Sequence, residues 1–247
     1  MKPVIELCVE GVDGAVAAQQ GGADRVELCA SLMEGGITPS LGTLRATLAA
    51  VSVPVHIMVR PRGGDFLYSE REFASMLDDV ATFRDAGAAG VVFGCLTPDG
   101  QVDEGRTAAL VAKARPARAT FHRAFDMTAD PEAALEALIR CGVDIVLTSG
   151  QAPDGVAGMA MMARLVAQAR GRIVILGCGG LRPETIGIVR RTAGLSELHF
   201  SAPVTLASGM AYRKNNLAMG SAPLEREFSQ VGTDPDLVRA TIAAARL

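Results

Sequence analysis

Residues 130–150 read DPEAALEALIRCGVDIVLTSG and contain one helix-to-strand unit. Asp130 is a residue type that caps helix N-termini, and Pro131 suits the first helical position. Gly142 is typical of the residue that follows a helix C-terminus. The apolar run Ile145-Val146-Leu147 then predicts a short buried strand. This stretch therefore predicts a helix, a tight turn and a strand, in the order found in α/β proteins.

The same pattern of a glycine turn followed by an apolar run occurs after Gly22 and after Gly87. Amphipathic or Ala-rich segments between such runs predict helices, for instance over 70–86, 104–115, 131–140 and 183–193. Strands are predicted over 4–8, 26–28, 55–59, 91–93, 119–122, 145–147, 173–176 and 198–200. Eight βα units in 247 residues predict an α/β fold of the (β/α)8 TIM-barrel type, as a single domain over residues 1–247.

A doubly wound sheet is the alternative fold, but it usually has a Gly-rich turn after its first strand, and residues 9–12 (VEGV) form no such turn. The last βα unit is expected to be irregular. Residues 205–223 have the Gly, Ser and Asn content of a loop, and residues 234–247 predict a closing helix.

Composition narrows the class of function. The chain has 24 Lys and Arg against 27 Asp and Glu, a net charge of −3, which argues against a nucleic-acid partner. No apolar run is long enough for a membrane helix, and residues 1–6 do not predict a secretory leader. The five cysteines form no CxxC pair, which favours a reducing compartment, so a cytoplasmic protein is expected.

Polar residues concentrate where the predicted strands end, which is where barrel enzymes place their active sites. Arg60, Arg62, Arg123 and Ser149 suit binding of a small anionic ligand. The predicted turn after strand seven, with Ser201 after strand eight, occupies the usual phosphate-binding position of such barrels, which adds Gly179 and Gly180. Side chains that could move protons are Glu6, Glu27, Asp65, His122, Asp126 and His199. His56 is expected to be a core residue.

The tripeptide Glu-Leu-Cys occurs in both of the first two predicted strands. Because side chains alternate along a strand, Glu6 shares a face with Cys8, and Glu27 with Cys29. Their apolar alternates suit the helix-packed outside, so these four side chains are expected to point toward the barrel axis. Two facing thiols suit Cu(I), although each cysteine could instead be a small buried hydrophobe.

The two glutamates leave two interpretations open. They could be barrel-core ion pairs, for which Arg60 on the neighbouring third strand is an available partner. They could instead be a general acid and base with raised pKa values.

Four long motifs together are similar to the CutC copper homeostasis family. They are residues 27–40 (ELCASLMEGGITPS), 60–69 (RPRGGDFLYS), 120–126 (TFHRAFD) and 147–150 (LTSG). The resemblance covers about residues 3–220 and implies a cytoplasmic barrel linked to copper tolerance. It also implies Cu(I) bound through Cys8 and Cys29, and it is compatible with a homodimer.

The chain departs from the family pattern at a few positions. Gly177-Cys178 stands where the family more often has Pro-Gly, and Thr185 stands where many members have Asn, which weakens the anion site at strand seven. Cys95 and Cys141 are additional thiols.

Two functions therefore remain open. One is a copper-homeostasis protein that binds a copper ion, Cu(I), through Cys8 and Cys29. The other is a barrel enzyme that acts on a small anionic metabolite, phosphorylated or carboxylated, with an indirect link to copper.

Overall fold

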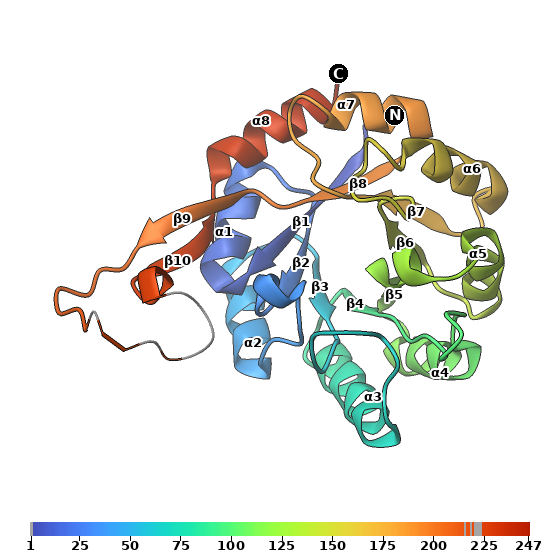
Figure 1. The fold of residues 1–247 in the computed structure, drawn as a ribbon, viewed down its shortest axis with the longest axis horizontal. Helices are drawn as coiled ribbons and strands as arrows, with labels where there is room; N and C mark the ends of the chain where they lie inside the picture. Colours follow the sequence, from blue (N-terminus) through green and yellow to red (C-terminus); the bar gives the residue numbers. More distant parts are fainter. Residues whose placement is uncertain (1, 215, 218, 220–223) are drawn as a thin grey trace.

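Eight parallel strands close into a barrel, in which β8 completes the circle by pairing with β1 (Figure 1). The computed structural model describes residues 2–214, 216, 217, 219 and 224–247. The strands are β1 (Val4–Glu10), β2 (Arg25–Cys29), β3 (Val55–Met58), β4 (Gly90–Phe93), β5 (Arg118–Phe121), β6 (Ile145–Thr148), β7 (Val174–Gly177) and β8 (Glu197–Phe200). The TIM-type barrel predicted from the sequence is confirmed.

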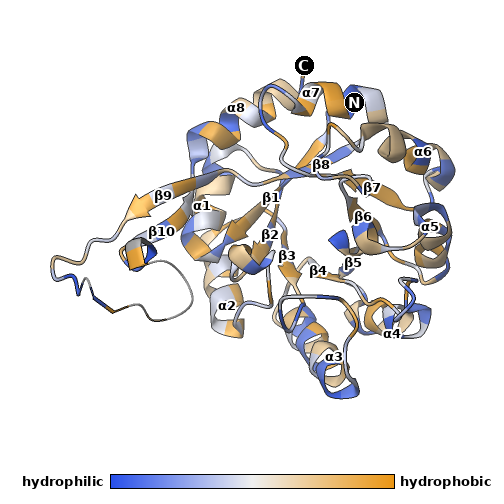
Figure 2. Ribbon diagram, viewed as in Figure 1, coloured by the Kyte–Doolittle hydropathy of each residue, from blue (hydrophilic) through white to orange (hydrophobic). Residues whose placement is uncertain are grey.

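Within the described ranges, eight α-helices surround the barrel, and Figure 2 shows their mixed polar and apolar faces around the largely apolar strands. They are α1 (Gly11–Gly21), α2 (Leu41–Ala50), α3 (Glu70–Asp85), α4 (Glu104–Ala114), α5 (Pro131–Arg140), α6 (Met159–Ala169), α7 (Ile186–Ala193) and α8 (Pro235–Ala245). Short 3-10 turns lie at η1 (Leu32–Glu34), η2 (Arg123–Met127) and η3 (Leu224–Arg226). None of the described helices is long and apolar enough to cross a membrane.

The unit at residues 130–150 forms as its residue types dictate. Asp130 Oδ1 accepts hydrogen bonds from the first backbone N–H groups of α5, at 3.0 Å from Glu132 and 3.1 Å from Ala133. Gly142 follows the helix with a φ of +75°, which favours glycine. Asp144 then accepts a hydrogen bond of 2.7 Å from the backbone N–H of Ala119, and this ties the start of β6 to β5.

Alternation along β1 decides which side chains enter the barrel. Ile5 and Leu7 are fully buried among the hydrophobic residues that pack under the helices. Glu6 and Cys8 point the other way, toward the barrel axis, as the sequence predicts. The register places Glu6 beside His199 of β8 and Cys8 beside Glu27 of β2.

An antiparallel hairpin of β9 (Pro203–Ala207) and β10 (Ser229–Thr233) extends from the barrel beyond β8 (Figure 1). This hairpin confirms the prediction of an irregular last βα unit. The prediction of a loop from residue 205 is wrong for residues 205–207, which lie in β9. Gly232 of β10 leaves room for the side chain of Leu206 in β9, because a Cβ at position 232 would lie 2.7 Å from Leu206 Cδ1. Residues 215, 218 and 220–223 of the expected loop lie outside the described residues.

Candidate metal and ligand site at the barrel mouth

Two thiols lie side by side at the carboxyl ends of β1 and β2. Cys8 Sγ is 3.9 Å from Cys29 Sγ, and Cys29 Sγ donates to Glu27 Oε2 at 3.6 Å. Cys29 is buried, whereas Cys8 is partly open to the mouth. The structure thus brings the two cysteines of the repeated tripeptide into direct contact, as the alternation of the two strands predicts.

His199 of β8 joins the thiols. Its Nδ1 lies 2.8 Å from Glu6 Oε1, and its Nε2 lies 3.8 Å from Glu27 Oε2. Cys8, Glu27 and His199 offer one sulfur, one oxygen and one nitrogen atom that all lie within 4.8 Å of one another. This spacing is compatible with three ligands around one metal ion.

Glu6 is anchored from beneath by an arginine that the sequence analysis missed. Arg25 forms ion pairs with Glu6 and with Glu197, the latter at 2.8 Å. Burial alone would raise the pKa of Glu6, but the charge of Arg25 and the hydrogen bond from His199 outweigh it and hold that pKa well below its ordinary value. Glu6 is therefore an ionised carboxylate, and its ion-pair character is the interpretation that the geometry favours.

Arg60, the expected partner of these glutamates, does not pair with either of them. Arg60 donates to the backbone carbonyls of Glu34, Gly36 and Gly64 at 2.6, 3.1 and 2.9 Å. Arg60 lies past the end of β3, so its side chain reaches the loops, whereas Arg25 is the direct partner of Glu6 in the strand register. Alternation could have found Arg25, because it shares a face with Glu27.

The two cysteines, Glu27 and His199 form a thiol cluster whose pKa values are shifted in different directions. The hydrogen bond with Cys29, followed by the contact with His199, lowers the pKa of Cys8 to about 5 despite burial. The same hydrogen bond between the two sulfurs, and then burial, raises the pKa of Cys29 well above its usual range. Burial, and then the charge of Cys8, also raises the pKa of Glu27. Burial opposes a charge on His199, but Glu27, Cys8 and Glu6 together raise its pKa.

Asp126 organises the end of β6. It accepts hydrogen bonds from Thr148 Oγ1 at 2.5 Å and from Ser149 N at 3.1 Å, and it pairs with Arg123 Nε at 2.7 Å. Arg123 also donates to Ser149 Oγ at 3.0 Å. Asp126 and Ser149 are therefore committed to holding the loops, while Arg123 keeps a half-exposed guanidinium at the rim.

Arg62 and Asp65 serve the loop that contains them. Arg62 pairs with Glu72 at 2.7 Å and with Asp65 at 3.1 Å, and it donates to the backbone carbonyls of the same loop. Their charges are thus used in holding the loop, and Arg62 does not line the inner cavity that Cys8 lines.

The glycine turn after β7 lies apart from the thiol cluster. Gly155 donates to the carbonyl of Gly179 at 2.8 Å, and a Cβ on Gly179 would meet Gly155 N at 2.7 Å. The segment before α6 therefore packs against this turn. Gly180 is exposed, and Ser201 lines a cavity of about 260 Å³ together with Cys8 and residues of β10. The structure does not bring these three residues together into one anion site.

Two adjoining spaces give access to the cluster. An inner cavity of about 110 Å³ is lined by Cys8, Glu27, His122 and His199, among others. An outer cleft of about 650 Å³ shares Arg60, Phe66, Gly35 and Arg123 with it. Because they share these walls, the inner cavity is reached through the cleft.

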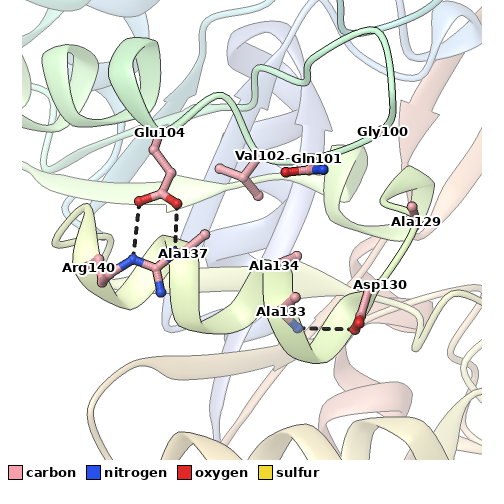
Figure 3. A pocket seen from close by; sticks show the side chains of 10 residues that line it. All are labelled: Gly100, Gln101, Val102, Glu104, Ala129, Asp130, Ala133, Ala134, Ala137 and Arg140. Carbon is pink, nitrogen blue, oxygen red and sulfur yellow. Dashed lines mark hydrogen bonds and ion pairs between the residues drawn. The ribbon is translucent and has the colours of Figure 1, made fainter.

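A further space lies outside the barrel, along α5 beside α4 (Figure 3). It measures about 320 Å³, and four alanines and one glycine form half of its ten lining residues. Its charged side chains are already partnered, with Glu104 and Arg140 paired at 2.6 Å and Asp130 capping α5. This groove has no thiol or imidazole among its lining residues and offers no comparable chemistry.

Fold and site together define a (β/α)8-barrel protein with a buried thiol, imidazole and carboxyl cluster at the mouth of the barrel. The model of the CutC family matches residues 3–204, and the chain belongs to that family.

A CutC family protein of Mesorhizobium japonicum is 60% identical over 244 residues, which span 99% of this chain and 95% of the relative. The human copper homeostasis protein cutC homolog is 45% identical over 98% of this chain and 89% of its own length. The crystal structure of a CutC protein from Streptococcus agalactiae is 27% identical with a TM-score of 0.76, covering 80% of this chain and 97% of its own.

Proposed function

We propose that this protein serves copper homeostasis in the cytoplasm by binding Cu(I) through Cys8 and Cys29. The observation that supports the proposal is the sulfur–sulfur distance of 3.9 Å at the partly open end of the barrel. Two metal–sulfur bonds of about 2.3 Å each span at most about 4.6 Å, so one ion can contact both sulfurs without movement of the strands.

The chemistry of the cluster favours a soft monovalent ion. Thiolates are the preferred ligands of Cu(I), and Cys8 has the lowered pKa of a thiolate. A cation between the sulfurs would replace the hydrogen bond with Cys8 that, ahead of burial, raises the pKa of Cys29. Met58 and Leu147 line the same cavity and limit the access of water.

His199 is the expected third ligand. Glu6 holds Nδ1 of its imidazole, which leaves Nε2 turned toward the thiol and the carboxyl group. A carboxylate behind a metal-binding histidine fixes the orientation of the ring, and loss of such a partner typically weakens metal affinity. Glu27 lies close enough to hydrogen-bond Cys29 and thereby to tune the charge of the sulfurs.

X-ray absorption at the copper edge tests this assignment. Copper loaded anaerobically into the wild-type protein should show two sulfur neighbours and one nitrogen neighbour. Cys8→Ser combined with Cys29→Ser should lose the sulfur shell, whereas Cys141→Ser should retain it, because Cys141 lies outside the barrel mouth. A copper environment of nitrogen and oxygen alone in the wild-type protein would contradict the proposal.

A second candidate is an enzyme that acts on a small anionic metabolite. The observation in its favour is the contrast between Glu6, with a lowered pKa, and Glu27, with a raised one, in a single cavity. Carboxyl groups pushed apart in this way often divide the roles of charge stabiliser and general acid. The candidate groups for proton transfer in such an enzyme are Glu27, His199 and His122, and Arg60 and Arg123 are the candidate binding groups, because all five line the inner cavity.

A further inference from the structure

Arg60 is a buried guanidinium without an acidic partner among the described residues. Its exposed fraction is 6%, and its guanidinium donates hydrogen bonds to three backbone carbonyl oxygens. Its Nε, moreover, has no hydrogen-bond partner in the described chain. Buried charges in proteins are normally paired, so this guanidinium is set up to receive an anion.

His122 provides a second unused donor in the same cavity. Its Nδ1 accepts the backbone N–H of Ala124 at 3.1 Å, so the proton of the neutral ring resides on Nε2. Burial, and then the charge of Arg60, lowers the pKa of His122 to about 3, which keeps the ring neutral. His122 is 4% exposed, and its Nε2 has no partner among the residues that the structure describes.

Phe66 brings the two donors together. The Arg60 guanidinium lies 5.1 Å from the centroid of the Phe66 ring, and the His122 ring lies 5.0 Å from it. All three residues line the inner cavity, and Phe66 and Arg60 continue into the outer cleft. Two unused N–H donors therefore belong to side chains that line one small cavity, and a carboxylate has one oxygen for each.

The cleft itself indicates what the rest of the ligand resembles. Its walls beyond Arg60 include Phe66, Leu67, Leu96, Pro98 and Met127, which favour an apolar body. Asp65 and Asp126 also line the cleft, and each is paired with an arginine. The inner cavity of about 110 Å³ has room for a group of only a few heavy atoms. A short-chain acid would place its charged head inside and its chain on these side chains.

We propose that the barrel mouth binds a small monocarboxylate, whose oxygens accept hydrogen bonds from His122 Nε2 and Arg60 Nε while its short apolar chain lies in the outer cleft. This ligand site shares the inner cavity with Cys8 but uses no thiol as a binding group, so it does not depend on copper. It gives the second candidate function the chemical class of its substrate.

The first test uses wild-type protein alone. Long-range ¹H–¹⁵N NMR of the histidine side chains should show His122 as the Nε2–H tautomer, and titration with butyrate should shift that resonance. Acetate and 4-methylpentanoate are the further probes, with about a fourfold gain in affinity per added methylene. A resonance that none of these probes moves would mean that His122 Nε2 binds no carboxylate, and the proposal would be wrong.

Uncharged and differently charged probes test the class of ligand. Butyramide, which has the same shape as butyrate without its charge, should bind at least tenfold more weakly. Inorganic phosphate should also bind more weakly, because the site offers two free donors rather than the several that phosphate uses. Equal binding of butyramide, or tighter binding of phosphate, would overturn the assignment to a carboxylate.

Variants separate this site from the metal site. Arg60→Met should weaken butyrate binding by about ten- to a hundredfold and His122→Phe by about tenfold, since a charged and a neutral hydrogen bond are lost respectively. Arg45→Met, at an exposed position on α2, is the matched control and should bind as the wild type does. Both site variants should retain Cu(I) binding, whereas butyrate binding unchanged in Arg60→Met would contradict the proposal.

Discussion

His199 Nδ1 lies 2.8 Å from Glu6 Oε1. Glu6 is fully buried and also paired with Arg25, so this carboxylate joins three strands of the barrel, β1, β2 and β8. The ring orientation of His199, and with it the position of Nε2 beside the thiols, is thereby fixed from the barrel interior. The proposed metal site therefore depends on an ion-pair network that does not itself contact the metal.

Glu6→Gln tests that dependence. Removal of the charge leaves Arg25 and His199 without their shared carboxylate, and breaking such a buried pair costs about 3–5 kcal/mol of unfolding free energy. Cu(I) affinity should fall by about ten- to a hundredfold as the orientation of His199 relaxes. Urea unfolding and chelator competition measure the two effects.

The matched control is Glu104→Gln, which removes an exposed ion pair with Arg140. It should cost at most about 1 kcal/mol and leave Cu(I) affinity unchanged. Equal losses of unfolding free energy and of Cu(I) affinity in the two variants would show that the Glu6 network does not support the metal site.

The pH dependence of the alkylation rate of Cys8 should report the lowered pKa of its thiol. Because its pKa is lowered to about 5, the thiolate is already present at pH 7, and the rate of alkylation should fall only as the pH drops through about 5. The hydrogen bond with Cys29 is the largest cause, so Cys29→Ala should move the midpoint upward, toward the ordinary thiol value of about 8.5. Iodoacetamide labelling of metal-free protein, followed by mass spectrometry, gives both profiles. A wild-type midpoint near that of an ordinary thiol would refute this account of the cluster.

His56 should make the fold sensitive to acid. It is 1% exposed, and burial lowers its pKa to about 4, whereas the unfolded chain has an ordinary pKa of about 6.5. Below pH 6.5 the unfolded state therefore binds a proton that the folded state does not bind. The free energy of unfolding consequently falls as the pH drops from 6.5 toward 4. This contribution is fully present above pH 6.5.

The magnitude follows from about 1.4 kcal/mol per pH unit. Between pH 6.5 and pH 5 the wild-type protein should lose about 2 kcal/mol more unfolding free energy than His56→Asn, as measured by urea denaturation at each pH. His199 and the other titrating groups are present in both proteins and cancel in the comparison. Parallel curves for the two proteins would show that His56 does not titrate in this way.

Much of the barrel could be predicted from the sequence because its signals are local. A glycine turn and an apolar run mark β2, β4 and β6, and period-two alternation places Glu6, Cys8, Glu27 and Cys29 on the inner face. Arg25 was missed because a charged residue at a strand start looks like part of the turn, and only the pairing of β1 with β2 shows that it meets Glu6.

The parts that could not be predicted depend on contacts between distant segments. Arg60 follows a strand as expected, but three carbonyls from two different loops decide where its guanidinium lies. Likewise β9 reads as a loop because its partner, β10, begins at Ser229, far along the chain. The unused donor of His122 depends on its bond to Ala124, which no spacing rule reveals.

An anaerobic Cu(I) titration against a chromophoric chelator tests the central claim most directly. The wild-type protein should remove one Cu(I) per chain from the chelator, and Cys8→Ser combined with Cys29→Ser should remove none. Arg60→Ala and Cys141→Ser, which leave the sulfur pair intact, should behave as the wild type does. Wild-type binding no tighter than that of ordinary exposed thiols, or binding that persists in the double variant, would contradict a copper site at these cysteines.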